Sequence, residues 1–356
     1  MKAKLSTAKY ISAGIASALL FGAATPASKA LLGGIQPQAL AGLLYLGAAL
    51  GVLPLVIKER AFQWPWRAGR RTFLLLTGAI VLGGILGPLL LLFALKSANS
   101  GSVSLWLNLE LVATIILGHF VFREQMSLRG WIAAGGTIVA AILLVGGEGD
   151  RGLLPAVLIT AGCICWGFDN HFTALIDGIS PAQTTLWKGV VAGALNLFIG
   201  WTVTGGVGLP VLIIAALLVG SVSYGFSIML YVTAAQGLGA TRSQMIFSTA
   251  PLFGLLLSVT ALGEAFTGAQ ALAAVLIVAS LIFIFSENHI HFHGHESKVL
   301  HQHSHQHDLL HHNHNHEGLG SKVSHVHLHE HEPQEHAHKH WPDLHHRHGH
   351  EEDKES

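Results

Sequence analysis

Residues 38–57 read QALAGLLYLGAALGVLPLVI, a run of twenty residues without a charged side chain. An apolar run of about 18 or more residues is long enough to cross a bilayer as an α-helix. Backbone N–H and C=O groups find no water in the hydrocarbon core, so a helix, which pairs them internally, is the expected structure. The run therefore predicts a transmembrane helix.

Similar apolar runs recur along the chain as far as residue 286, separated by glycine, proline and charged residues. The predicted spans are 10–32, 38–57, 73–94, 102–121, 129–147, 153–173, 184–204, 209–232, 242–262 and 269–286. The sequence thus predicts an all-α polytopic membrane protein with ten transmembrane helices. Glycines four residues apart, such as Gly47 and Gly51 or Gly189 and Gly193, predict close contacts between helices.

The composition supports this class and excludes others. Hydrophobic residues make up 51% of the 356 residues and charged residues 11%, against roughly 25% charged in soluble domains. Mean hydropathy is +0.51. No phosphate-binding loop, nucleophile elbow or zinc-protease motif is present, so the chain is not expected to be an enzyme. The basic residues are few and scattered, which argues against nucleic-acid binding, and the two cysteines cannot form a disulfide framework.

The distribution of lysine and arginine predicts the orientation. If the N-terminus is cytoplasmic, twelve Lys/Arg residues fall on the inner side of residues 1–287 and three on the outer side. With ten helices the C-terminus is then cytoplasmic too, and we expect a multi-pass protein of the inner (plasma) membrane. A cleavable signal peptide ending near Ala27 to Ala30 is the alternative for the first run. It would leave nine helices and conflict with this charge distribution.

The two halves of the body share a pattern. Ser104 opens an apolar run that ends near Arg123-Glu124, and Ser243 opens a similar run that ends near Gly263-Glu264. Five helices per half is an odd number, so the second half would enter the membrane upside down. Such inverted repeats are typical of secondary transporters. The predicted domains are repeats at 1–147 and 153–287, followed by a tail at 288–356.

The chain resembles the EamA-type carriers of the drug/metabolite transporter superfamily, over about residues 1–287. The residues that carry the resemblance are Leu20-Phe21-Gly22 to Lys29, Leu107 to Glu110 with Glu124, Cys163 to His171, Tyr224-Gly225, and Phe247 to Pro251 with Glu264. Phe21 stands where the family usually has tryptophan. The resemblance implies ten helices in two inverted five-helix repeats, a central cavity and alternating access. It implies no single substrate, since members carry amino acids, metabolites, drugs or nucleotide sugars.

Ionisable residues inside a bilayer are costly, and each is a candidate for function. Glu110, near the middle of its span, can bind a cationic group or take a proton that drives exchange. Alternatively it is a structural carboxylate paired with Lys29 or capped by Asn108. The alternative for Lys29 is that its side chain simply extends to the membrane interface. Asp169 and Lys188 can form an inner gate or a plain ion pair. The predicted substrate-binding residues are Lys29, Asn108, Glu110, Asp169, Asn170, Lys188 and Tyr224.

Three other polar residues receive structural interpretations. Glu124 and Glu264 follow apolar runs, and helix capping or loop anchoring is expected of them. As a solvated loop carboxylate, Glu264 is expected to affect turnover less than Glu110. His119 stands alone on its span, which favours a structural role.

The tail differs from the body. Of the 25 histidines, 23 lie from His289 onward, and residues 288–356 carry 5 Lys/Arg and 11 Asp/Glu. This composition cannot bury a core, so a disordered tail is expected. Histidines alternate with other residues, and imidazole suits Zn, Ni, Cu and Co ions. The predicted metal-binding residues are His289, His291, His293, His295, His301, His303, His305, His307, His345, His346, His348 and His350.

Two functions remain open from the sequence. The first is a secondary transporter of a small organic solute or metabolite with a metal-binding tail. The alternative is a divalent metal (Zn, Ni or Co) exporter whose tail buffers or senses the metal. No cofactor is expected to be required. The expected partners are the lipid bilayer, a small-molecule substrate and divalent metal ions, with no nucleic acid, and the chain is expected to be a monomer or homodimer.

Overall fold

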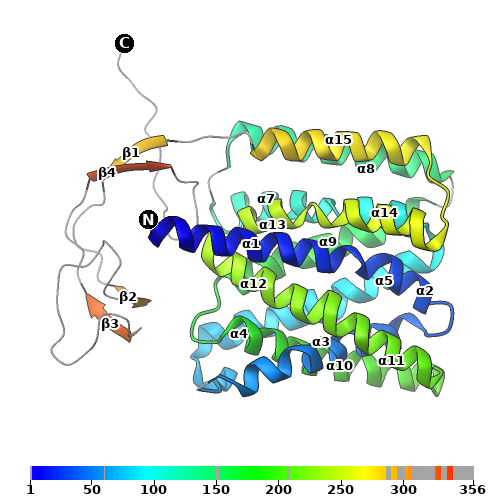
Figure 1. Cartoon of the computed structure of the whole chain (residues 1–356), viewed down its shortest axis with the longest axis horizontal. Coiled ribbons are helices and arrows are strands. Elements are labelled where there is room, and N and C mark those ends of the chain that lie inside the picture. Colours follow the sequence, from blue (N-terminus) through cyan, green and yellow to red (C-terminus); the bar gives the residue numbers. More distant parts are fainter. Residues whose placement is uncertain are drawn as a thin grey trace, which may run out of the picture. The chain divides into compact units, whose positions relative to one another are not determined.

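The computed structural model describes residues 2–59, 61–124, 126–149, 152–206, 208–285, 290–294, 301–305, 325–329 and 335–339. The chain divides into two units: the helices form one, and the strands lie in the other, within 287–341. In the helical unit most helices run along a common direction, parallel or antiparallel to one another (Figure 1). This is the arrangement expected of a membrane-spanning bundle.

The first half of the bundle contains eight α-helices, one 3₁₀ turn and one π-helical turn among the described residues. In chain order these are α1 (Lys2–Gly22), α2 (Ala24–Leu31), α3 (Pro37–Ile57), η1 (Pro65–Arg67), α4 (Arg70–Ala79), η2 (Ile80–Leu86), α5 (Gly87–Ser97), α6 (Ser100–Trp106), α7 (Leu109–Phe120) and α8 (Leu128–Glu148).

The second half contains seven α-helices and a second π-helical turn within the described ranges. They are α9 (Leu153–Ala174), α10 (Pro181–Thr204), α11 (Pro210–Val219), η4 (Gly220–Phe226), α12 (Ser227–Leu238), α13 (Ala240–Phe247), α14 (Ala250–Leu262) and α15 (Gly268–Phe285).

The helices reproduce the ten predicted spans. In the part of the chain that the structure describes, nine helical segments are long and apolar enough to cross a membrane, and α15 adds a shorter apolar helix over Gly268–Phe283. Most span ends lie within three residues of the prediction, but the eighth span extends to Leu238. Large apolar side chains on the outside, such as Leu218 and Ile282, are 62% and 64% exposed, which suits contact with lipid chains. The predicted all-α membrane fold is confirmed.

The fourth and ninth spans are not the continuous helices that the sequence predicts. The fourth is interrupted between α6 and α7, at Leu107 and Asn108, and the ninth between α13 and α14, at Ser248 and Thr249. Pro251 lies in the first turn of α14, where its missing N–H costs nothing, although it cannot continue the preceding helix. Composition hides these interruptions because the flanking residues are as apolar as those of an unbroken span.

The third and eighth spans share another irregularity. Each contains a π-helical turn, η2 in the third and η4 in the eighth, with α-helix on both sides. In the third span Pro88 follows η2 in the first turn of α5, where its ring disfavours an α-helical bond to the preceding turn. Such π-turns widen a helix locally and leave backbone carbonyls open to side chains.

Close packing surrounds α3, which lies against α10, α11 and η4. A Cβ added at Gly47 would come 2.4 Å from the carbonyl oxygen of Leu217, and one at Gly189 would come 2.7 Å from the carbonyl oxygen of Tyr45. Only a hydrogen atom fits at these contacts. The predicted role of the regularly spaced glycines in helix contact is therefore confirmed at these positions.

Four five-residue strands lie in the tail: β1 (Ile290–Gly294), β2 (His301–His305), β3 (His325–His329) and β4 (Glu335–Lys339). Strands β1 and β4 pair antiparallel, and so do β2 and β3. The tail expected to be disordered thus has strand segments where histidine alternates with other residues, a period that matches a strand. The rest of the tail lies outside the described residues.

Candidate functional site

A cavity lies among the helices of the helical unit. Side chains from helices of both halves form its wall. They are Phe21, Tyr45, Glu110, Trp166, Asp169, Asn170, Thr173, Lys188, Tyr224, Ser227, Ile228, Tyr231, Val232 and Phe247. Six of these are aromatic, and three carry full charges when ionised. A space of this kind, mostly apolar with a few polar groups, has the character of a small-molecule site.

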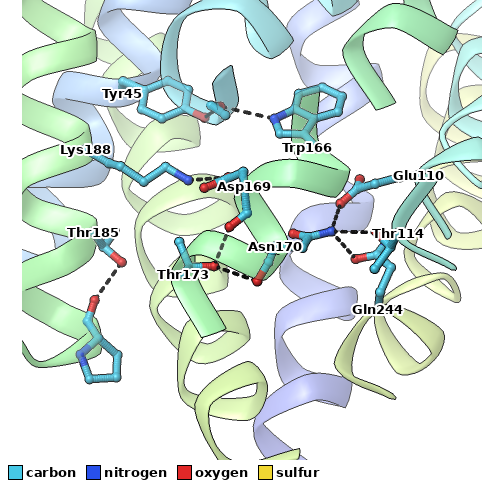
Figure 2. Close-up of polar contacts among 12 residues, drawn as sticks. Tyr45, Glu110, Thr114, Trp166, Asp169, Asn170, Thr173, Thr185, Lys188 and Gln244 are labelled. Atoms are coloured by element: carbon cyan, nitrogen blue, oxygen red, sulfur yellow. Dashed lines mark hydrogen bonds and ion pairs between the residues drawn. The ribbon is translucent and has the colours of Figure 1, made fainter. Parts of the chain in front are cut away.

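Glu110 is held in the cavity wall by an uncharged partner. The Nδ2 atom of Asn170 donates to Oε1 of Glu110 at 2.9 Å, to Oγ1 of Thr114 at 3.1 Å and to Oε1 of Gln244 at 3.2 Å. Figure 2 shows these three acceptors converging on the one amide nitrogen. The network joins α7, α9 and α13, so the position of Glu110 depends on helices of both halves.

Asp169 and Lys188 form the ion pair that the sequence suggests. Nζ of Lys188 donates to Oδ2 of Asp169 at 2.5 Å, and both side chains are buried. The carboxylate packs so closely on η2 that a Cβ at Gly83 would fall 2.0 Å from Oδ2 of Asp169. The charge of Asp169 is therefore balanced within the protein, in contrast to that of Glu110.

The π-turn η2 provides a carbonyl acceptor beside the cavity. The hydroxyl of Tyr45 donates to the carbonyl oxygen of Gly83 at 2.6 Å, and Nε1 of Trp166 donates to the same oxygen at 3.1 Å. Asn196 donates to the next carbonyl, that of Gly84, at 3.2 Å. These bonds fix two aromatic rings of the wall, because each ring has one polar atom that needs a partner when buried.

A second, smaller pocket adjoins the first. It shares Phe21, Glu110 and Phe247 with the cavity. Its other lining residues lie on the first span and on the interrupted fourth and ninth spans. They are Gly22, Thr25, Ser104, Leu107, Gln244, Ser248, Ala250, Pro251 and Gly254. Glu110 thus borders two pockets rather than one.

Comparison with known proteins identifies the family. The model of the EamA-like transporter family matches residues 8–146 and again residues 153–286. The chain belongs to the EamA-like transporter family. It is also similar to a protein of Methanothermobacter thermautotrophicus (strain Delta H) described as an uncharacterized transporter, with 26% identity over 300 residues, which cover 78% of this chain and 85% of that protein.

A solved crystal structure has the same fold. It superposes with a TM-score of 0.59 at 16% sequence identity, over 78% of this chain and 96% of the other. Together with the apolar helices, the family makes this chain a multi-pass membrane transporter rather than an enzyme.

Five of the seven predicted substrate-binding residues of this EamA-like transporter line the cavity, namely Glu110, Asp169, Asn170, Lys188 and Tyr224. The other two lie elsewhere. Nζ of Lys29 donates to the carbonyl oxygens of Leu95 and Ala98 at 2.7 and 2.8 Å, so it caps the end of α5 rather than pairing with Glu110. Asn108 is buried at the interruption between α6 and α7 and donates to the carbonyl oxygen of Leu105 at 3.3 Å.

Several cavity residues of the transporter were not singled out from sequence as substrate-binding. Tyr45, Tyr231 and Phe247 are aromatic, and Thr173 and Ser227 are small and polar. One signal was present: three of the four tyrosines in the chain line the cavity. A tyrosine inside an apolar span needs a partner for its hydroxyl, and this requirement favours a polar interior.

The expectation that Glu264 is a solvated loop carboxylate is wrong. Its side chain is half-buried and accepts hydrogen bonds from the backbone N–H groups of Ser100 and Gly101, both at 3.0 Å. The predicted capping role is present, but the helix that Glu264 caps, α6, belongs to the other half. Glu124 is buried as well.

No group of three or more His, Cys, Asp or Glu residues arranged to hold a metal ion occurs among the described residues of the transporter. Of the predicted metal-binding histidines, His291 and His293 lie in β1, and His301, His303 and His305 lie in β2. The others, namely His289, His295, His307, His345, His346, His348 and His350, lie outside the described residues.

Proposed function

We propose that this chain is a secondary transporter that moves a small organic solute with a positively charged group by alternating access. The observation that carries the proposal is the cavity, whose wall contains six aromatic side chains and the carboxylate of Glu110. That carboxylate is bound by the neutral amide of Asn170, whereas the other carboxylate, Asp169, is already paired with Lys188. A cation that enters the cavity can bind Glu110 and the faces of the rings.

The proposed architecture is two five-helix repeats, 1–147 and 153–287, inverted relative to each other. In support, the family model matches each half separately. Both halves have a π-turn in the third span and an interruption in the fourth. Secondary transporters built in this way bind substrate between the repeats, beside discontinuous helices, and the cavity of this chain has such helices in its wall.

The proposed setting is the inner (plasma) membrane with both termini in the cytoplasm. The bias of lysine and arginine supports this orientation. The tail, residues 288–356, would then lie on the cytoplasmic side of the membrane.

The tail is proposed to bind Zn, Ni or Co ions. The strand register supports this proposal, because it pairs histidine with histidine at five positions, His291 with His338, His293 with His336, His301 with His329, His303 with His327 and His305 with His325. Directly opposed residues are neighbours in an antiparallel pair. Several histidines can therefore gather around one ion.

A divalent metal exporter is the second candidate, and the histidine content of the tail is the observation that favours it. The two candidates differ in what crosses the membrane. The cavity wall is dominated by aromatic rings, which suit an organic cation better than a small divalent ion, since such ions prefer imidazole, thiolate or carboxylate ligands.

A transport assay with purified full-length protein in liposomes tests the proposal. Labelled aromatic amines, their neutral isosteres, amino acids and Zn²⁺ are offered separately, to the full chain and to a chain that ends at Asn288. The proposal expects uptake of a cationic amine over its neutral isostere by both chains. Movement of Zn²⁺ without movement of any organic solute would support the metal exporter instead.

A further inference from the structure

The two interrupted spans run antiparallel and place their ends at opposite sides of the bundle. Helix α6 packs on α14, and α7 packs on α13. In Figure 1, α7 and α13 lie toward one end of the bundle, and α14 extends to the other. The start of the fourth span therefore lies beside the end of the ninth, and the start of the ninth lies beside the end of the fourth.

The loops that follow these spans have the same backbone geometry. Arg123 and Gly263 have φ values of 57° and 67°, and Arg123 is the non-glycine residue with positive φ in the described chain. In each loop the next residue is a glutamate whose N–H donates to a carbonyl six residues earlier, Glu124 to Gly118 at 2.7 Å and Glu264 to Ser258 at 3.1 Å. Each loop thus turns its glutamate back toward the bundle.

Each glutamate bonds the first turn of the interrupted span in the other half. Glu264 accepts from the backbone N–H groups of Ser100 and Gly101 at the start of α6. Glu124 accepts from the hydroxyl of Thr241 at 2.5 Å, at the start of α13. Its other carboxylate oxygen lies 3.5 Å from Nε2 of His171, on α9.

Glycines make room at both contacts. A Cβ added at Gly118 would lie 3.0 Å from Oε2 of Glu124 and 3.1 Å from Nε2 of His171. One added at Gly101 would lie 3.0 Å from Leu255 and 3.7 Å from Oε2 of Glu264. The two carboxylates therefore occupy corresponding positions at the two ends, and the packing is tighter around Glu124 than around Glu264.

Both contacts lie one helical turn from the pockets. Gln244, three residues after Thr241, accepts from the Asn170 amide that holds Glu110. Ser104, three residues after Gly101, lines the smaller pocket beside Glu110. A displacement of either helix start would be transmitted to the surroundings of Glu110.

We infer that Glu124 and Glu264 are positioning residues that close the two ends of the transport pathway in turn. Both contacts are made in this structure. Release of one carboxylate lets the helix start at that end separate while the other contact holds. This inference rests on the proposed alternating-access transport and names the side chains that control it.

Sided cysteine labelling tests the inference on the full chain. Ser227, in the cavity wall, is changed to Cys in a Cys163→Ala, Cys165→Ala background, and a membrane-impermeant thiol reagent is applied to right-side-out or inside-out vesicles. Glu124→Gln should raise the labelling rate about tenfold from the face on which residue 124 lies, and Glu264→Gln from the opposite face. A tenfold shift is the scale of one lost hydrogen bond to a charged group.

Two further variants keep the result interpretable. Glu59→Gln is the matched control, because the hydrogen bonds of Glu59 go to Ser180 and Gln183 at the start of α10 rather than to α6 or α13. Its labelling should stay at the reference rate on both faces. Gly118→Ala crowds the Glu124 contact without removing charge and should reproduce the sidedness of Glu124→Gln. Unchanged labelling in both gate variants and in Gly118→Ala, or equal increases on both faces, would overturn the inference. The labelling assay needs no substrate. Labelling that increases on one face, in a protein that takes up no organic solute, would therefore refute the proposed function and leave this inference standing.

Discussion

Glu110 occupies a position from which its charge can act on two spaces. It borders both the cavity and the smaller pocket, and its hydrogen-bond partner is the amide of Asn170. A carboxylate that is buried in a membrane protein with an uncharged partner is costly unless it binds a cation or a proton during function. This reasoning gives Glu110 a role that the paired Asp169 does not share.

Glu110→Gln is accordingly expected to reduce solute uptake at least about tenfold, the factor that corresponds to 1.4 kcal/mol of lost binding to a cation. Glutamine keeps the shape and can still accept from Asn170, so the protein should insert and purify normally. Uptake into liposomes at matched protein amounts measures the effect, with Glu59→Gln as the control, because Glu59 bonds Ser180 and Gln183 outside the cavity wall. Uptake by Glu110→Gln equal to that of the unaltered chain would show that the carboxylate has no part in transport.

At this scale the sequence predicts the charged residues of the cavity but only one of its six aromatic residues, Tyr224. Glu110, Asp169 and Lys188 stand out because charges are rare in apolar spans. Tyr45 and Tyr231 do not stand out, since aromatic residues are equally at home against lipid. The prediction that the Glu264 side chain is solvated was wrong for a different reason. The loop turns back at Gly263, and a sequence pattern does not show in which direction a loop carboxylate points.

Helices in this bundle pack closely at glycines. A larger side chain is expected to destabilise the bundle most at glycines that contact the backbone of a neighbouring helix. Gly47 on α3 faces the carbonyl of Leu217, and Gly189 on α10 faces the backbone of Tyr45 and Ala49. Lipid gives no hydrophobic force between helices, so this close contact contributes much of their association. The spacing of the glycines predicts the contacts, whereas the interruptions and π-turns of the spans depend on partners that are distant in sequence.

Gly47→Ala should therefore destabilise the bundle by about 1–3 kcal/mol, the usual cost of overpacking. The added methyl would lie 2.4 Å from the carbonyl oxygen of Leu217, and the helix around it would have to move. Thermal unfolding in detergent, followed by the loss of monodisperse protein, measures the change.

Gly135→Ala is the matched control for this prediction, because nothing lies within 4 Å of the added Cβ on α8. Its effect should be neutral or stabilising by about 0.5–1 kcal/mol, since alanine is the better helix former. A loss of stability in Gly135→Ala as large as that in Gly47→Ala would show that contact at Gly47 is not the cause.

For the whole molecule, orientation decides which end of the cavity faces the cytoplasm. With ten spans both termini lie on the same side, and from the bias of lysine and arginine we expect that side to be the cytoplasm. The number of helices and their limits are predictable from apolar runs, because the bilayer fixes their length. The pairing of α6 with α14 is not, since it depends on how the two halves meet.

Reporter fusions after residues 150 and 287 test this orientation. The reporter after residue 150 follows five spans and should be active on the outer side, and the one after residue 287 should be active in the cytoplasm. Labelling of single cysteines at the same places in intact cells provides the control. Outside labelling at residue 287 would contradict the ten-span orientation.

The tail is expected to bind several Zn or Ni ions per chain without being needed for the bundle to fold. The helices bury their apolar surface against one another, and a chain that ends at Asn288 should insert into membranes and stay monodisperse in detergent. Metal ligation needs neutral imidazole, so binding should weaken as pH falls through about 6.5, the pKa of free imidazole side chains. Calorimetric titration of residues 288–356 with Zn²⁺ should show more than one ion at about pH 7.5 and far weaker binding at about pH 5, on either side of that pKa. Binding that does not change with pH, or loss of folding on truncation, would mean instead that the tail is an integral structural part.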